Sequence, residues 1–406
     1  MSLAALSDLS GLEDGCATIA PDSLALAEFP TPLYSRKQVV KAGKALLEPM
    51  PWIEDRADEY RQVFKIAYDW RSSHAYPMRK MRQELRAMVQ DLLRRRGITA
   101  ARLKRMKSIR KKLERLDTTL AQIQDIGGCR AIVDSQDTLN LLLAQFRSDT
   151  ARHKLRIHRS YIDDPRLSGY RSHHLVFDFQ PENASEEPYR DRRIEIQLRS
   201  RLQHSWATAV EAIGLHRNED LKASEGDADW LRFFLLVSAE FAEFEGTAPV
   251  PYAPLQPERI KEIKALNKSL GAVRRLETLN EAFRYLEHNK GLRASYYMLQ
   301  FDNAKQTLDI SSYDRIAGAS EGYGYAESNH MDMNTVVVEV DTLEALKEAY
   351  PNYFLDVRLF TQNVVHMMSD KPLVTKLQIQ QEKQTALGHD VSWLRKYFPG
   401  MYQDNG

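Results

Sequence analysis

The sequence predicts a fold in which helices pack against a β-sheet, of the α/β or α+β class. Three observations support this prediction. The N-terminal part has apolar residues at helical spacing, several short β-branched runs follow it, and a second set of helical and strand-like patterns begins after a proline-rich segment. Because the chain has 406 residues, two domains, or one domain with substantial extensions, are expected.

The N-terminal part reads as an arm, then helices, then strands. Weak periodicity over 1–35 predicts a loosely held arm. Helical spacing predicts helices at 35–50, at 56–96 with a break near Pro77, and from 97 through 116. Strands are predicted at about 129–133, 155–162, 173–179 and 192–198. A helix at 201–215 follows the last of them.

A proline-rich join at 246–257 predicts a domain boundary, because prolines at 249, 251, 254 and 257 cannot continue a helix or a central strand. We therefore divide the chain into the arm, a domain over 36–248 and a smaller C-terminal α+β module over 258–406, whose role the sequence does not indicate. The elements expected in that module are a charged helix at 258–289, strands at about 294–301, 335–340 and 353–359, a helix at 342–350 and a Gly/Ser/Tyr-rich loop at 317–329.

Composition excludes several classes of protein. The formal net charge is +1, but residues 79–115 are strongly basic and predict a local electropositive surface. The only cysteines, Cys16 and Cys129, are too few for a disulfide framework or a thiolate zinc site, which favours a reducing compartment. No run approaches the roughly 18 apolar residues of a membrane span. We expect a soluble, cytoplasmic protein that has no membrane partner.

The segment from Arg102 to Arg115 combines basic groups with helical spacing. If a helix begins near Ser108, then Ser108, Lys112 and Arg115 share one face, because they are four and three residues apart. Arg102 and Lys104 precede that helix. Such a group of cations suits a triphosphate, and an arginine plane can stack on a base. The alternative is a solvated basic helix face.

Asp125 precedes Gly127, Gly128 and an apolar strand that contains Arg130. Glycines allow the backbone to approach a ligand closely. A carboxylate at the edge of a strand is a suitable ligand for Mg²⁺, which commonly takes one or two protein carboxylates together with phosphate oxygens. The alternative is an ordinary turn with a capping aspartate.

Two further segments carry polar groups of the kind that nucleotides require. Tyr170 follows Gly169 and can offer its ring to a base, while Arg166, Ser172 and His174 can donate to phosphates. In the second segment, Glu195 lies between two isoleucines, and strand alternation predicts that its face also carries Arg193, Gln197 and Arg199. The alternatives are a common Gly-Tyr turn and a salt-bridged sheet face.

The order of these motifs resembles the synthetase domain of the RelA/SpoT alarmone family, over about residues 70–215. The resemblance implies an α+β, nucleotidyltransferase-like fold with a mixed β-sheet flanked by helices. The motifs that carry it are R-x-K-x-x-x-S-I-x-x-K-x-x-R at 102–115, D-I-G-G-x-R at 125–130, G-Y-R-S-x-H at 169–174, E-I-Q-L-R-S at 195–200 and H-x-W-A in the following helix.

The resemblance also implies roles for individual residues. Asp125 would bind Mg²⁺, and Glu195 would join it at the metal or accept the proton of the attacking hydroxyl. Arg130 would close on the adenine opposite Arg102, and Tyr170 would stack on the acceptor base. The remaining ATP-binding residues would be Lys104, Ser108, Lys112 and Arg115, and the remaining acceptor-binding residues Arg166, Ser172, His174, Gln197 and Arg199.

The expected activity is that of a Mg²⁺-dependent pyrophosphokinase, which moves the β,γ-pyrophosphate of ATP to the 3′-hydroxyl of GDP or GTP to make (p)ppGpp. Two alternatives stay open: a toxin-like relative whose acceptor is the 3′ end of tRNA or an adenine nucleotide, and an inactive nucleotide- or RNA-sensing module. A homo-oligomer and an antitoxin partner also stay open. The clustered histidines of the family's hydrolase half are missing, since His389-Asp390 stands alone, so we expect synthesis without hydrolysis.

Overall fold

The computed structural model describes most of the chain from Phe29 to Gln378. The described residues are 29–48, 57–93, 97–148, 152–217, 219–282, 284–288, 294–302, 305, 307–329, 334–354 and 356–378. Most of the arm expected at 1–35 therefore lies outside the described residues, as do Cys16 and His389-Asp390. No described helix combines the length and the apolar character that a membrane crossing requires.

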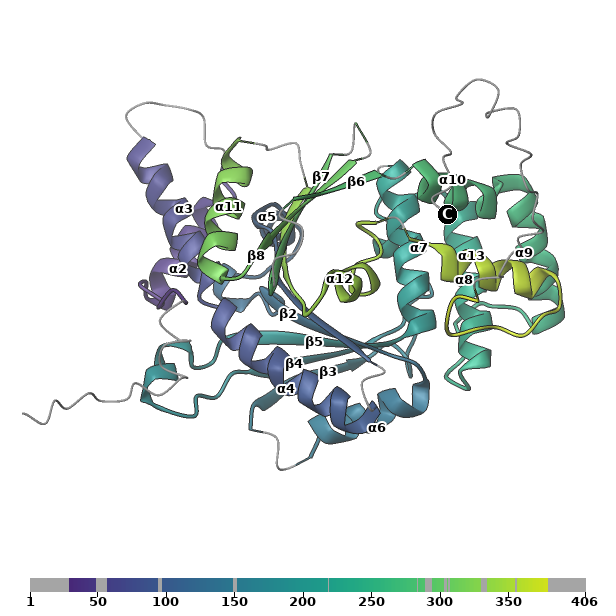
Figure 1. The fold of residues 1–406 in the computed structure, drawn as a ribbon, viewed down its shortest axis with the longest axis horizontal. Helices are drawn as coiled ribbons and strands as arrows, with labels where there is room; N and C mark the ends of the chain where they lie inside the picture. The colour runs from purple at the N-terminus through teal and green to yellow at the C-terminus, as the bar shows by residue number, and fades with distance from the viewer. Residues whose placement is uncertain are drawn as a thin grey trace, which may run out of the picture.

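One mixed sheet of nine strands runs through the described part of the chain, in the order β3-β4-β5-β2-β1-β9-β7-β8-β6 (Figure 1). The pairs β2–β5 and β6–β8 are parallel and the other neighbours are antiparallel, which confirms the predicted mixed sheet. The strands are β1 (Ile98–Leu103), β2 (Gly127–Val133), β3 (Lys154–Ser160), β4 (His173–Asp178), β5 (Arg193–Ser200), β6 (Arg284–His288), β7 (Tyr296–Asp302), β8 (Thr307–Tyr313) and β9 (Asn334–Glu339).

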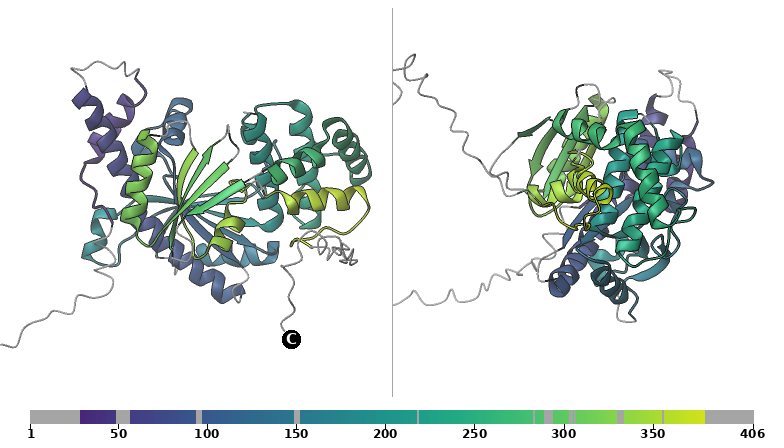
Figure 2. Two further views of the ribbon diagram at one scale, coloured as in Figure 1. Left: turned by 45° about the horizontal axis from the view of Figure 1, so that its top comes forward. Right: turned by 90° about the vertical axis from the view of Figure 1, so that its right-hand side faces the viewer.

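Some helices pack against the sheet, and a further group of helices lies beside one end of it (Figures 1 and 2). The α-helices are α2 (Arg36–Ala45), α3 (Ala57–Ser72), α4 (Ala75–Leu93), α5 (Met106–Arg115), α6 (Gln136–Phe146), α7 (Arg201–Arg217), α8 (Ala228–Phe244), α9 (Gln256–Leu270), α10 (Ala272–Ala282), α11 (Ile316–Asn329), α12 (Leu343–Ala349) and α13 (Arg358–Met368). Short 3₁₀ turns lie at Leu120–Gln122, Ala184–Tyr189 and Leu221–Ala223. The helices α7, α8, α9, α10 and α13 pack into a separate apolar cluster beside the sheet.

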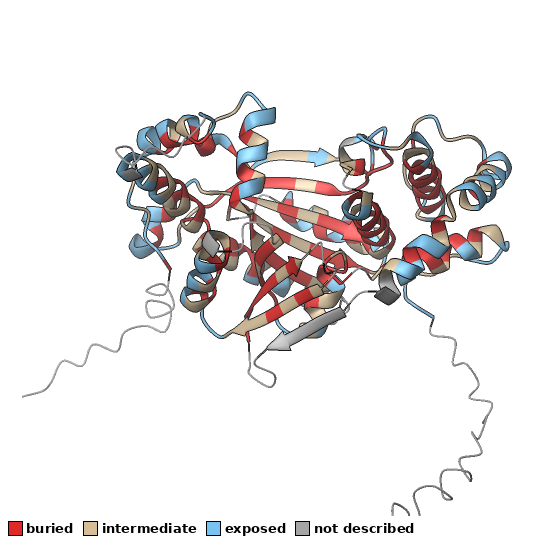
Figure 3. Cartoon of the chain, turned by 90° about the horizontal axis from the view of Figure 1, so that it is seen from above, coloured by how far each residue is buried: buried red, intermediate tan, exposed pale blue. Residues whose placement is uncertain are grey.

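Strand alternation decides which face of the sheet becomes the core. In β5, the residues Ile194, Ile196 and Leu198 pack against α4 and α6, together with apolar residues of β2 and β4. Along the central strands, buried residues are interrupted by half-buried ones, as in the first part of β2 and of β5 (Figure 3). The intervening positions of β5, beginning with Glu195, therefore point to the opposite face, where α12 packs on β1 and β9.

The C-terminal strands continue the sheet of the N-terminal part, because β9 pairs with β1. Side chains also join the two parts: Arg82 of α4 contacts Glu339 and Asp341 at 3.3 and 2.8 Å, and Arg79 donates to the hydroxyl of Tyr296 at 3.1 Å. Arg79 and Arg82, at the start of the basic stretch 79–115, thus connect the N-terminal and C-terminal parts of the protein. The division at 246–257 remains a prediction from sequence, and the sheet runs across it.

Several element predictions were wrong. The expected helix at 97–116 is β1 followed by α5, and the expected helix at 258–289 is α9, α10 and β6. The expected loop at 317–329 is α11, and the strand expected at 353–359 is a turn that leads into α13. The strand β8 had no counterpart in the prediction. By contrast, the predicted strands that became β2, β3, β4 and β5, and the helix that became α7, are confirmed.

Candidate active site

The candidate site lies on the sheet face opposite α4, where three neighbouring strands present polar residues. Register aligns Arg102 of β1 with Gly128 of β2, and Gly128 with Glu195 of β5. In the same way, Arg130 of β2 stands opposite Gln197 of β5. The predicted shared face of Glu195, Gln197 and Arg199 is supported by hydrogen bonds, because Gln197 bonds to Glu195 at 2.7 Å and to Arg199 at 3.2 Å.

The two glycines before this face have different functions. A Cβ on Gly127 would come within 2.6 Å of the Ile194 side chain and 3.4 Å of Met78 Cβ, so this glycine permits close packing against α4. A Cβ on Gly128 would meet nothing closer than 3.8 Å. Of these two glycines, only Gly128 therefore leaves open space beside the polar row. The close approach of a ligand expected at both glycines is thus ruled out at Gly127 and stays a prediction at Gly128.

Asp125 is held by two ammonium groups. Lys104 Nζ donates to Asp125 Oδ2 at 2.8 Å, and Lys112 Nζ, from α5, donates to Oδ1 at 2.9 Å. Burial would disfavour the charged carboxylate, but the two lysines outweigh it and lower the pKa of Asp125 to about 2. Asp125 is therefore ionised at neutral pH, next to cations that the sequence assigned to ATP.

Glu195 is also an ionised carboxylate with fixed partners. His174 Nδ1 lies 2.8 Å from Glu195 Oε1, and Gln197 donates to Oε2 at 2.7 Å. Burial and the nearby Asp125 act to raise the pKa of Glu195, yet the contact with His174 holds it below its usual value. In turn, although burial opposes its charge, contacts with Tyr170 and Glu195 raise the pKa of His174 above its usual value.

Tyr170 belongs to this hydrogen-bonded chain more than to an open surface. Its side chain is largely buried, at 7% exposed, and its hydroxyl lies 2.8 Å from His174 Nε2 and accepts from Arg199 at 2.6 Å. Burial would raise the pKa of Tyr170, but Arg199 and His174 lower it to about 8. The ring packs against Tyr161, His174 and Trp206. Stacking of Tyr170 on an acceptor base therefore stays a prediction that requires this packing to open.

Arg102 and Arg130 face residues from the distant C-terminal part. The guanidinium carbons of Arg102 and Arg130 lie 5.7 and 5.0 Å from the centroid of the Tyr350 ring. Arg102 also donates to the Tyr353 hydroxyl at 3.1 Å, and Arg130 donates to the Ala349 carbonyl at 2.8 Å. Burial, with the nearby Arg199 and Arg102, lowers the pKa of Arg130 to about 10, so it remains charged at neutral pH.

A small cavity joins these groups. Its volume is about 50 Å³. It is lined by both carboxylates, by Tyr350 and by neighbouring residues of β1, β2 and β5, namely Arg102, Lys104, Asp125, Gly128, Cys129, Arg130, Glu195, Gln197 and Tyr350. The structure therefore brings together residues that are up to 248 positions apart, from Arg102 to Tyr350.

Comparison with known proteins is decisive for the central part of the chain. The family described as "Region found in RelA / SpoT proteins" matches residues 101–219. This central part of the chain is therefore similar to a region that RelA and SpoT proteins share. The match covers β2, β3, β4 and β5 and the end of β1 that carries Arg102. No curated protein matches the chain.

Solved structures similar to part of this chain include small alarmone synthetase 1 from Bacillus subtilis bound to its product pppGpp. It is 22% identical, with a TM-score of 0.35, over 42% of this chain and 87% of that one. A GTP pyrophosphokinase family protein from Streptococcus pneumoniae is 19% identical, with a TM-score of 0.34, over 42% of this chain and 84% of that one.

Some residues assigned to the site lie apart from its centre. Ser172 is fully buried, and its hydroxyl donates to the backbone carbonyls of His173 and Leu198. Arg115 is exposed at the end of α5, and Ser108 is half-buried on that helix. Arg166 lies over the Tyr161 ring, with 4.3 Å from its guanidinium carbon to the ring centroid. The ligand roles of these four residues remain predictions.

Other residues near the site were not predicted from the sequence. Arg71 donates from Nε to the Lys104 carbonyl at 2.7 Å and thereby fixes the backbone of a site lysine. Lys222 forms an ion pair with Glu211, and burial with three nearby arginines lowers the pKa of Lys222 well below its usual value. Tyr350 and Tyr353 were missed too, although two tyrosines three residues apart, at the end of one predicted helix and the start of a predicted strand, were a visible signal.

The two carboxylates of the site, Asp125 and Glu195, are suitable ligands for Mg²⁺. Asp125 and Glu195 line one cavity and both are ionised, and Mg²⁺ commonly takes only one or two protein carboxylates beside substrate phosphates and water. Within the described ranges, no group of three or more His, Cys, Asp or Glu side chains is arranged to hold a metal ion. Asp125 and Glu195 would thus share the ion with a phosphorylated substrate.

Proposed function

We propose that the protein is an ATP-dependent pyrophosphokinase that transfers the β,γ-pyrophosphoryl group of ATP to the 3′-hydroxyl of GDP or GTP. The observation that carries the proposal is one cavity lined by two ionised carboxylates and by the cations Arg102, Lys104 and Arg130, within a RelA/SpoT-type synthetase domain. The site would work in the cytoplasm and would need Mg²⁺ to neutralise phosphate charge.

The proposed reaction forms one phosphorus–oxygen bond and breaks another. The acceptor 3′-oxygen attacks the β-phosphorus of ATP, the bond from this phosphorus to the α,β-bridging oxygen breaks, and AMP leaves with that oxygen. We propose that Glu195 takes the proton of the hydroxyl, a role supported by its ionised state and by the contacts of its two oxygens with His174 and Gln197. Bound Mg²⁺ would supply charge stabilisation at the transferring phosphates.

Lys104 and Lys112 would exchange partners during binding. Both ammonium groups contact Asp125 in the described conformation, and both are about one quarter exposed, at 24% and 26%. Phosphate oxygens of ATP would attract these cations, which would free Asp125 for the metal. Transfer of this kind depends mainly on positioning and on charge neutralisation, and the site offers both.

The direct test is product formation with defined acceptors. Purified full-length protein is incubated with Mg²⁺ and ATP labelled on its γ-phosphate, together with GDP, GTP, an adenine nucleotide or bulk tRNA in separate reactions. We expect the label to move to GDP or GTP, AMP to appear in equal amount, and Glu195→Gln to form no product. Label on tRNA or on the adenine nucleotide alone would replace the acceptor in this proposal. Label that stays on ATP with every acceptor, in protein that binds ATP, would refute it.

A further inference from the structure

The two arginines assigned to adenine already hold an aromatic ring in this structure. Tyr350 is 2% exposed, and the guanidinium carbons of Arg102 and Arg130 lie 5.7 and 5.0 Å from its ring centroid. A guanidinium plane over an aromatic ring is the contact that an arginine would also make with a purine. The ring of Tyr350 therefore occupies contacts that a nucleotide base would need.

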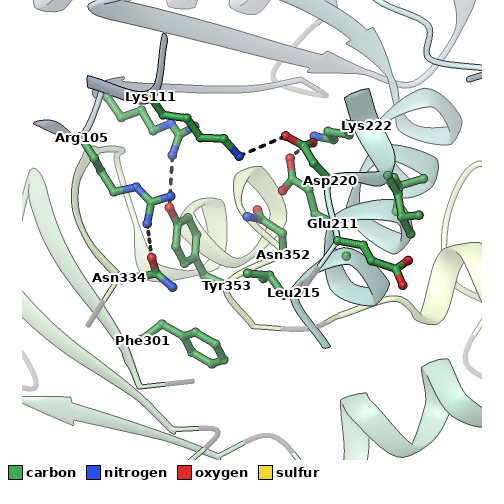
Figure 4. A pocket seen from close by; sticks show the side chains of 15 residues that line it. Arg105, Lys111, Glu211, Leu215, Asp220, Lys222, Phe301, Asn334, Asn352 and Tyr353 are labelled. Carbon is green, nitrogen blue, oxygen red and sulfur yellow. Dashed lines mark hydrogen bonds and ion pairs between the residues drawn. The ribbon is translucent and has the colours of Figure 1, made fainter. Parts of the chain in front are cut away.

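Hydrogen bonds from the same short segment use further donors of these arginines. Arg102 donates to the Tyr353 hydroxyl at 3.1 Å, and Arg130 donates to the Ala349 carbonyl at 2.8 Å. Figure 4 shows Tyr353 extending from the C-terminal segment toward the wall that carries Arg105 and Lys111. We call residues 349–353 the plug segment, because this segment supplies both the aromatic ring and the hydrogen-bond acceptors that contact the two arginines.

The space left beside the carboxylates is too small for a nucleotide. The cavity lined by Asp125, Glu195 and Tyr350 has a volume of about 50 Å³, whereas pockets that bind drug-sized ligands are roughly 300–1,000 Å³. A larger cavity of about 400 Å³ lies next to it, with Arg102, Arg105, Asn352 and Tyr353 in its walls (Figure 4). Neither Asp125 nor Glu195 lines this larger cavity. The plug segment therefore closes the carboxylates off from a volume that could hold ATP.

Contacts of the preceding helix hold the plug segment in place. The helix α12 just before it packs through Leu346 and Ala349 on the apolar residues of β1 and β9. Glu348 contacts α7, since its carboxylate pairs with Arg201 at 3.0 Å and its carbonyl lies 3.1 Å from His204 Nε2. Displacing the segment would thus break a defined set of contacts, and the same arginines would then be free.

We infer that the plug segment is an autoinhibitory element that occupies the donor-nucleotide site, so that docking of Tyr350 and binding of ATP exclude each other. The inference rests on the proposed function in one respect, the identity of the donor as ATP. The apparent association constant of the protein for ATP is then the intrinsic constant multiplied by the fraction of molecules in which the segment is displaced. Activation consists of moving residues 349–353 away from Arg102 and Arg130.

The test is ATP binding without an acceptor, measured by calorimetry on full-length variants at fixed Mg²⁺. We expect Tyr350→Ala to tighten binding by at least about tenfold, because the ring that competes with adenine is removed. Tyr350→Phe keeps the ring and should bind like the wild type. Tyr252→Ala is the matched control, since Tyr252 is 80% exposed and lies outside both cavities, and it should also bind like the wild type.

Each contrary outcome has a distinct meaning. If Tyr350→Ala binds ATP as weakly as the wild type or more weakly, with an unchanged melting temperature, the autoinhibitory role is refuted while the donor site stands. If none of the folded variants binds ATP, the proposed function is refuted as well. Tyr353→Phe removes only the hydroxyl that accepts from Arg102, so it gives a second readout if Tyr350→Ala does not fold. It should tighten ATP binding a few-fold, and unchanged or weaker binding by this variant would contradict the inference.

Discussion

Asp125→Asn should separate the structural role of this carboxylate from its catalytic one. The variant keeps the shape of the side chain and removes the charge that Lys104 and Lys112 contact. Lowering of its pKa from 3.8 to about 2 corresponds to on the order of 2 kcal/mol of folding free energy, at about 1.4 kcal/mol for each tenfold change. The side chain is only 18% exposed, so solvent screening does not remove this contribution.

The sign of the pH dependence follows from the lowered pKa. A carboxyl group whose pKa is lower in the folded state stabilises the fold above its unfolded value, near 3.8, and that contribution is lost as the pH falls through about 2. Between pH 5 and pH 8, the wild type should therefore be more stable than Asp125→Asn by a constant margin. Urea denaturation at several pH values in this range measures it, with the exposed Asp117→Asn as the control that should show no loss.

Ligand binding and turnover should change in opposite directions in this variant. Without Asp125, the two lysines are free for phosphates, so ATP should bind at least as tightly in the absence of Mg²⁺, in chains that also carry Tyr350→Ala to open the site. With Mg²⁺, turnover should fall by about 100-fold or more, as expected for loss of a central electrostatic contact. Weaker Mg²⁺-free ATP binding, or turnover above roughly a tenth of the parent chain, would show that the exchange of partners at Asp125 is not part of the mechanism.

Three further predictions concern Glu195 and its neighbours. Glu195→Gln should lower turnover by about 100-fold or more with a melting temperature within a few degrees of the wild type, and an active variant would remove Glu195 as the base. Because the pKa of His174 is raised in the folded state, its contribution to stability is complete below its unfolded value and is lost as the pH rises through the folded one, so His174→Gln should cost more stability at pH 5.5 than at pH 9. Ultraviolet titration should show one tyrosine that ionises near pH 8 and that is missing from Tyr170→Phe; an identical titration of both proteins would place that hydroxyl outside the contacts with Arg199 and His174.

Local patterns predicted the elements whose burial is set by alternation. In β5, the sequence Arg-Ile-Glu-Ile-Gln-Leu-Arg-Ser carries its own register, because an isoleucine or leucine at every second position must face the core. The same alternation predicts the shared face of Glu195, Gln197 and Arg199. The strand β1 was missed because Ile-Thr-Ala-Ala-Arg-Leu has no strong preference of its own, and pairing with β2 and β9 makes it a strand.

The helix α11 shows why a high glycine content does not always indicate a loop. Its glycines at 318, 322 and 324 predicted a loop, but a Cβ on Gly322 would come within 2.5 Å of the Tyr313 hydroxyl oxygen, and one on Gly318 within 3.3 Å of the Tyr313 ring. These glycines at 318 and 322 let the helix approach β8 closely, which no local pattern reveals. The contacts of Arg102 and Arg130 with Tyr350 could not be predicted either, because they depend on the tertiary packing of segments that are far apart in the sequence.

The same strand that carries Arg102 also joins the C-terminal part to the N-terminal part of the sheet, and this limits how the site can open. The β1 residues Ala101 and Arg102 pair with Glu339 and Val338 of β9, and Arg82 of α4 contacts Glu339 from its side chain. Detaching residues 258–406 as a unit would therefore expose an unpaired edge of β1 and leave Arg82 without its buried partner, which is costly. Moving α12 and residues 349–353 alone leaves these pairs intact. Opening of the site by a local shift of the plug segment is thus compatible with the shared sheet, whereas release of the whole C-terminal part would disturb the strand on which the site is built.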